Sequence, residues 1–223
     1  NLLARGLSLV MVGLPVFWLH WNRVERDASH DEVERSSPIR AVFLYGVRLA
    51  TLIPVFQNVL AVVNRTALSV LDLSPAAAFI GSSQNLNDNL VAIAVNLAAW
   101  FYFGKILEKE WLIPHTALVE TRRVYRAAWV LYGLMLTLAG MHQVLRFIFA
   151  ASGDLNELYG NWLGNGIALA LVGTPLWVWH WRIFHRTVSE PGEKDSLLRM
   201  GLLFILSLGS ATTAALSLAN VLA

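Results

Sequence analysis

Six long apolar runs alternate with shorter charged stretches along the chain. The runs cover residues 2–21, 39–63, 90–106, 124–149, 162–181 and 197–222. A helix needs roughly 20 apolar residues to cross a hydrocarbon core of about 30 Å, and the runs are close to that length. Because a lipid-facing backbone must satisfy its hydrogen bonds within its own segment, each run is predicted to be a helix. The pattern predicts an all-α integral membrane bundle of six transmembrane helices, with residues 1–223 forming a single transmembrane domain.

The basic residues gather in alternate connections between the runs. Of the 17 Lys and Arg residues, 13 lie within residues 23–40, 105–126 and 182–199. By the positive-inside rule these three connections face the cytoplasm, and the two ends of the chain are expected outside. An apolar run begins directly after Asn1, so we also expect an upstream segment.

The longest connection on the opposite face covers residues 65–88. Its first part, TALSVLDL, is predicted to be a short helix lying in the membrane interface. Its end, GSSQNLNDN, is rich in Asn, Ser and Asp and is typical of an exposed turn. The connection is therefore expected to be an outer interfacial segment and not a separate domain.

One segment of the chain recurs. VGLPVFWLHW at residues 12–21 matches VGTPLWVWHW at residues 172–181, and both precede a charged connection. A weaker middle copy begins at Val95 and has Phe103 and Gly104 where the other two have His and Trp. Self-similarity at this scale indicates a repeated structural unit.

The helices that return across the membrane also match one another. RAVFLYG from Arg40 resembles RAAWVLYG from Arg126, and Gln57 falls opposite Gln143. The repeated unit is therefore predicted to be a helix pair, used three times. The three pairs cover approximately residues 1–64, 89–150 and 159–223. A pseudo-threefold ring and a flat layer both satisfy this pattern.

Composition agrees with lipid surroundings and excludes several classes of site. The chain is 56% hydrophobic and 14% charged, outside the usual range of soluble domains, and its nine Trp suit a membrane interface. A net charge of only +2, with the basic residues in short connections, gives no support for a nucleic-acid partner. The absence of Cys excludes disulfides, iron–sulfur ligation and covalent attachment of a c-type haem.

The repeated helix end G-x-P-x-x-W/F-x-x-H-W, followed by a charged connection and a returning helix rich in Leu and Tyr, supports a family assignment. It resembles a family of uncharacterised bacterial membrane proteins built from repeated helix pairs and known as a domain of unknown function. The resemblance covers most of the chain and departs from it at Phe103 and Gly104. It implies a bundle in the prokaryotic cytoplasmic (inner) membrane and supplies no activity.

Three histidines are candidates for binding a cofactor. His20 and His180 occupy equivalent positions in the repeat, and two imidazoles on facing helices are the ligands that a membrane haem b needs. Both lie at cytoplasmic helix ends, where Trp and His are ordinary interface residues, so the absence of a cofactor is the leading expectation and haem b or chlorin the minority hypothesis. His142 lies deeper, beside Gln143. There, a polar clamp between helices is favoured over a single axial pigment ligand.

Arg48 places a positive charge inside the second span. It lies eight residues, about 12 Å, beyond Arg40, and no Asp or Glu lies in any predicted span to neutralise it. A charge at this depth is costly, so Arg48 is expected to face the bundle, to extend toward the interface, or to meet a lipid or quinone head group, with Tyr45 one turn earlier sharing the site. The missing intramembrane acid argues against a proton-coupled transporter.

The leading functional hypothesis is a non-enzymatic membrane scaffold or accessory subunit that binds other membrane subunits in a larger assembly. The alternatives are a haem-, pigment- or quinone-binding electron-transfer subunit, and a small-solute carrier with pseudo-threefold helix pairs. An enzyme is the class with the least support: no catalytic constellation is evident, and no metal site is predicted. Small Ser and Thr residues in the last run are typical of helix packing.

Overall fold

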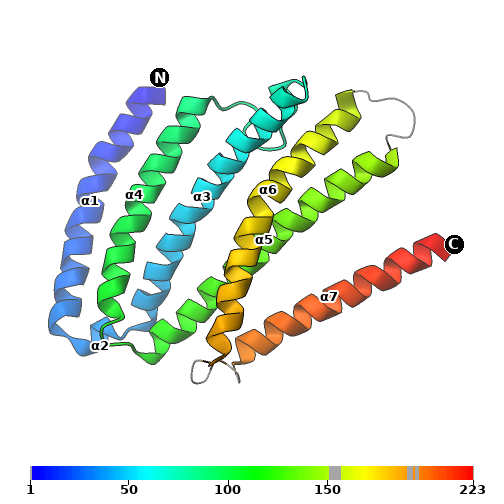
Figure 1. Cartoon of the computed structure of the whole chain (residues 1–223). Helices are drawn as coiled ribbons and strands as arrows, with labels where there is room; N and C mark the ends of the chain where they lie inside the picture. The colour runs from blue at the N-terminus through cyan, green and yellow to red at the C-terminus, as the bar shows by residue number, and fades with distance from the viewer. Residues whose placement is uncertain (1, 151–156, 190–192, 194–195, 223) are drawn as a thin grey trace.

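Every element of the chain that the structure describes is a helix. The computed structural model describes residues 2–150, 157–189, 193 and 196–222. The elements in chain order are α1 (Leu2–His30), α2 (Glu32–Arg35), α3 (Pro38–Val70), the 3₁₀ helix η1 (Pro75–Ala77), α4 (Leu86–Glu110), α5 (Thr116–Ala150), α6 (Glu157–Arg186), the 3₁₀ helix η2 (Thr187–Ser189) and α7 (Leu197–Leu222) (Figure 1). The all-α class is confirmed, and each predicted apolar run falls within one long helix.

The long helices form an open row and not a closed ring (Figure 1). α1 lies at one edge beside α4, α3 follows, and α5 and α6 pack together beyond it, while α7 diverges from that pair. α3 is the central element, because it contacts α4, α5 and α6. Of the two arrangements compatible with the repeat, the structure shows the layer. The helix ends that flank the three basic connections lie on the same side of the layer, at the bottom of Figure 1, and we call this side the basic end.

Four helical segments of the described chain are long and apolar enough to cross a membrane, where the sequence predicts six. They are Pro38–Val70, Leu86–Glu110, Thr116–Phe149 and Tyr159–Ser189. In α7 the described side chains form an apolar stretch from Leu197 to Thr212, which is shorter than these four segments. In α1 the apolar run passes into polar residues from Asn22 onward. A membrane protein is supported, and six crossings are not confirmed.

The helices extend beyond the apolar runs into the charged connections. α1 continues past Trp21 to His30, and α5 begins at Thr116, eight residues before its predicted start at Val124. A helix satisfies its own backbone, so it can continue beyond the membrane while its charged side chains meet water. The short α2 then begins where Asp31 accepts a hydrogen bond of 2.8 Å from the Val33 N–H.

Glycines bring α5 and α6 into close contact. A Cβ atom on Gly133 would lie 2.6 Å from the backbone nitrogen of Trp177, and one on Gly140 would lie 2.6 Å from that of Ala170. From the other side, a Cβ atom on Gly173 would lie 2.7 Å from the backbone nitrogen of Thr137. Small residues let membrane helices approach closely enough for their backbones to pack, so α5 and α6 form the tightest pair of the fold.

The outer connection differs from its prediction. The segment TALSVLDL is not a separate interfacial helix, because its residues up to Val70 are the end of α3. The following residues fold back onto α6, where Asn165 accepts a hydrogen bond of 2.9 Å from the Phe79 N–H and donates one of 3.3 Å to the Ala77 carbonyl. Asn165 is buried and supplies partners that the short turn lacks, which holds the connection against the helices.

Candidate functional site

The structure places Arg48 and Tyr45 beside the same cavity. Both lie on α3 and line a cavity near the basic end, between α3, α4, α5 and α6. The Tyr45 hydroxyl accepts a hydrogen bond of 3.0 Å from the Trp111 indole of the α4–α5 connection. Its ring packs at 5.2 Å from that of Tyr125 on α5. The pair therefore belongs to a site built from several helices.

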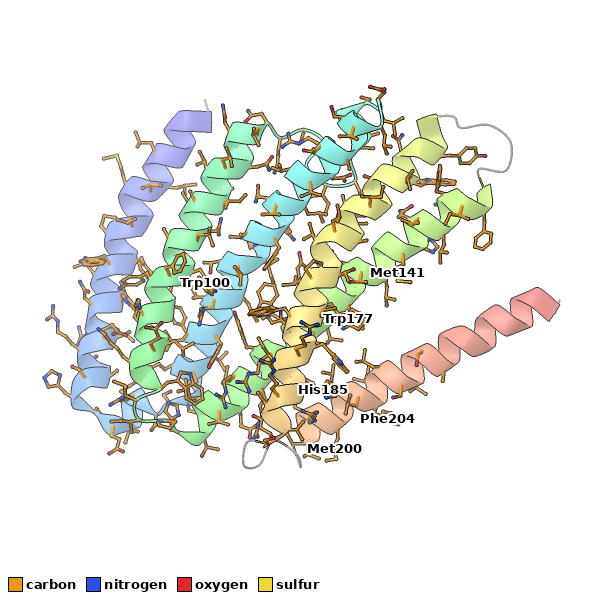
Figure 2. The ribbon with its side chains drawn as sticks, viewed as in Figure 1. Trp100, Met141, Trp177, His185, Met200 and Phe204 are labelled. Carbon is orange, nitrogen blue, oxygen red and sulfur yellow. The ribbon has the colours of Figure 1, made fainter. Side chains whose placement is uncertain are left out.

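The Arg48 guanidinium lies against aromatic rings. Its central carbon is 4.4 Å from the centre of the Trp100 ring and 6.0 Å from that of Tyr125. Trp100 lies about halfway along α4 (Figure 2). Among the residues that the structure describes, Arg48 makes no side-chain hydrogen bond or ion pair, and its Nε is buried. Cation–π attraction holds the group in place and leaves its N–H donors unused.

His20 and His180 are not brought together. They lie on α1 and α6, and α4 and α3 stand between those two helices (Figure 1). In each residue Nδ1 contacts the carbonyl oxygen four residues earlier, at 2.8 Å for His20 and 2.9 Å for His180. Each ring therefore bonds to its own helix.

His180 is instead part of the Arg48 cavity. It is half-buried, and its ring stacks on Trp129 of α5 with 5.4 Å between ring centres. It lines the same cavity as Arg48 and Tyr45. No sequence pattern indicates this contact, because it depends on how α6 packs beside α3 and α5.

His142 lies exposed on α5, and the polar clamp forms elsewhere. Asn58 of α3 accepts a hydrogen bond of 2.8 Å from the side chain of Asn89 on α4. Asn89 is fully buried, donates a second bond of 2.8 Å to Gln84, and accepts one from the Arg65 guanidinium. The bond between Asn58 and Asn89 is not predicted from the sequence.

Sequence reasoning also missed a buried ion-pair cluster at the basic end. Arg40 of α3 lies 2.8 Å from Glu110 at the end of α4 and 2.6 Å from Glu25 of α1. A similar pair joins Arg123 of α5 to Glu193 beyond α6, at 3.0 Å. Both pairs join residues 70 positions apart, and the second pair lies 83 positions after the first. That recurrence was the signal available in the sequence.

The described residues contain no group of three or more acidic, His or Cys side chains placed to hold a metal ion. What the cavity around Arg48 can do chemically is attract and hold an anion, because arginine donates hydrogen bonds and carries a permanent charge.

Comparison with known proteins identifies a family. The model of a family described as a domain of unknown function (DUF5671) matches residues 1–100 and 123–223. No curated protein and no solved structure matches the chain. The stretch between the two matched segments, residues 101–122, comprises the end of α4, the connection after it and the start of α5. Because the matched segments cover most of its length, the chain belongs to this family of domains of unknown function.

Proposed function

We propose that the chain is a non-enzymatic scaffold or accessory subunit of a larger assembly in the prokaryotic cytoplasmic membrane. In this proposal α1 and α7 cross the bilayer with the other four long helices, and the basic end faces the cytoplasm. The proposal rests on one observation above all: every residue of α1 from Gly6 to His20 is exposed. A crossing helix that packs so little against its own chain has faces available for other helices.

The surface of α1 has the form of a helix-packing face without a partner from this chain. Gly6 and Gly13 are seven residues apart and therefore lie on one side of the helix. Among the described residues, and apart from the adjoining backbone of the same helix, no atom lies within 4 Å of a Cβ built on either. Glycines of the same kind are covered by backbone in the α5–α6 pair, so a partner helix can approach α1 closely along this side.

The opposite edge of the row offers a second surface. Met200 and Phe204 lie on α7 where it diverges from α5 and α6, and both side chains are exposed (Figure 2). A Cβ built on Gly201 beside them would have no atom of the described residues within 4 Å, apart from the adjoining backbone of α7. The buried ion pairs of Arg40 and Arg123 connect the helices at the basic end, between these two edges. In the proposal the connected helices form the core, and the two edges bind the partners.

Neither alternative function gains a specific observation from the geometry. The helices of His20 and His180 are not neighbours, which gives no support to paired haem ligation. The open row differs from the closed pseudo-threefold arrangement that the carrier hypothesis assumes. The repeated helix pair is as compatible with a scaffold as with a carrier, because a repeated unit can extend a layer of helices without forming a pore.

The test uses the cysteine-free chain to report on the neighbours of α1. Leu9 lies three residues after Gly6 and four before Gly13, on the same side of the helix. A photoactivatable maleimide on Leu9→Cys, illuminated in native membranes, should give an adduct with a different membrane protein. Gly13→Leu should abolish the adduct, and Gly46→Leu, at an equally open glycine of α3, should keep it. An adduct with a second copy alone, or with lipid alone, would contradict the accessory role.

A further inference from the structure

The cavity around Arg48 has the features of a ligand site. Its volume is about 450 Å³, and it lies between four helices of the packed core near the basic end. Apolar side chains such as Leu107 and Ile183 line it together with three arginines, Arg48, Arg122 and Arg126. A cavity with this mixture of lining residues suits an amphiphilic ligand with a charged group better than a free ion.

The charge in the cavity is predominantly positive. Arg122 lies 4.2 Å above the Trp111 ring, and Arg126 is 4.0 Å from Glu193, which is itself 3.0 Å from Arg123. Of the residues that line the cavity, Glu108 alone carries a carboxylate. It is exposed and paired with Lys105 at 3.0 Å. The lining therefore attracts an anion.

Arg48 lies well inside α3. It is ten residues into α3, which corresponds to about 15 Å along the helix axis from Pro38. At that depth a guanidinium without a carboxylate partner is costly. An anionic ligand that reached it would give its unused N–H donors acceptors and would neutralise its charge.

Gly104 provides the space beside Arg48. A Cβ atom on Gly104 would lie 3.8 Å from the guanidinium carbon, so the arginine rests close to the surface of α4. In the aligned repeats the position of Gly104 is occupied by Trp21 and Trp181. The middle copy therefore departs from the repeat at the residue whose small size leaves room for the cavity.

We propose that this cavity binds the phosphate head group of an anionic phospholipid, with Arg48, Tyr45 and Arg122 as its contacts. Arginine matches phosphate geometry with two parallel donors. Basic pockets between transmembrane helices at the cytoplasmic face are a known way to hold anionic lipid head groups. The site is independent of the scaffold role, because none of its residues lies on α1 or α7.

The test is native mass spectrometry of the purified full chain with phosphatidylglycerol and with phosphatidylcholine. The wild-type chain should retain phosphatidylglycerol, and Arg48→Gln should bind it about tenfold more weakly, the loss expected for one charge-assisted contact. Gly104→Trp introduces the residue found at the aligned positions of the other two copies. This variant should abolish retention of phosphatidylglycerol, because the larger side chain fills the cavity. Gly104→Ala should retain the lipid, because its Cβ fits at an ordinary contact distance.

The outcomes separate the possible ligands. Arg48→Gln tests the charge and Gly104→Trp tests the space, so failure of one variant to fold leaves the other decisive. Equal retention of both lipids, or unchanged binding in a folded Arg48→Gln variant, would overturn the proposal. Displacement of the bound lipid by millimolar inorganic phosphate would also overturn it, because the site would then belong to free phosphate.

Discussion

Arg40 and Glu110 lie 70 residues apart in the sequence, and their side chains meet at 2.8 Å in a buried ion pair. The pair joins the first turn of α3 to the end of α4, and Glu25 of α1 contacts the same guanidinium. Arg35 of α2 adds a contact of 3.3 Å to Glu110. Four helices are thus tied together at the end where the basic connections gather.

Replacing Arg40 with Ala should destabilise the fold strongly. Glu110 would keep only the longer contact to Arg35, and breaking a buried ion pair by removing one partner costs about 3 kcal/mol or more. Thermal unfolding in detergent should show a clearly lower Tm. Lys105→Ala is the matched control, because its pair with Glu108 is exposed and should contribute little. Equal Tm values for the two variants would show that the Arg40–Glu110 ion pair does not stabilise the fold.

Adding a methyl group at Gly140 should disturb the α5–α6 pair. The new Cβ would lie 2.6 Å from the backbone nitrogen of Ala170, so the helices would have to separate. Gly140→Ala should lower the Tm and the monodisperse fraction in size-exclusion chromatography. Gly46→Ala, where nothing lies within 4 Å, should behave as wild type. A stable Gly140→Ala variant would mean that the two helices are not packed as the structure shows.

The buried Asn89 should stabilise the contact between α3 and α4. Asn89→Ala removes its bonds to Asn58 and Gln84, and interhelical hydrogen bonds of this kind contribute about 1 kcal/mol. Asn96 on the same helix bonds only to the Ala92 carbonyl within α4, so Asn96→Ala serves as the control. The Tm should fall more for Asn89→Ala, and the reverse order would argue against an interhelical clamp.

The double variant His20→Phe, His180→Phe should fold and should leave the absorption spectrum of the purified chain unchanged. Each imidazole bonds within its own helix, and a Phe ring can retain the stacking of His180 on Trp129. Visible spectroscopy after mild purification checks this. Loss of a Soret band in the double variant would favour the electron-transfer hypothesis over the scaffold.

The sequence predicted where the helices lie along the chain better than it predicted which helices contact one another. The apolar runs located all six long helices, because segment length and hydropathy are local properties. The open row was beyond that information, since helices that face lipid are apolar on most sides and carry a weak signal of which side packs. Gly133 and Gly140 were visible in the sequence, but their partners on α6 appear only once the two helices are in contact.

The candidate site was predicted only in part, because contacts between residues of different helices cannot be read from local sequence. The proximity of Arg48 to Tyr45 follows from their spacing along one helix, and the two residues line the same cavity. His180 and Gly104 joined the cavity from other helices, where spacing gives no guidance. The ion pair between Arg40 and Glu110 was also missed, although a second pair with the same separation recurs later in the chain.

The placement of the chain in the membrane underlies both the scaffold role and the lipid site. The most direct measurement is labelling of single-cysteine variants in intact cells with a membrane-impermeant maleimide, since the chain has no Cys of its own. Thr116→Cys and Ser189→Cys, in two basic connections, should be labelled only after permeabilisation, whereas Ser83→Cys, in the outer connection, should be labelled in intact cells. Labelling of Thr116→Cys or Ser189→Cys from outside, or protection of Ser83→Cys, would contradict the account.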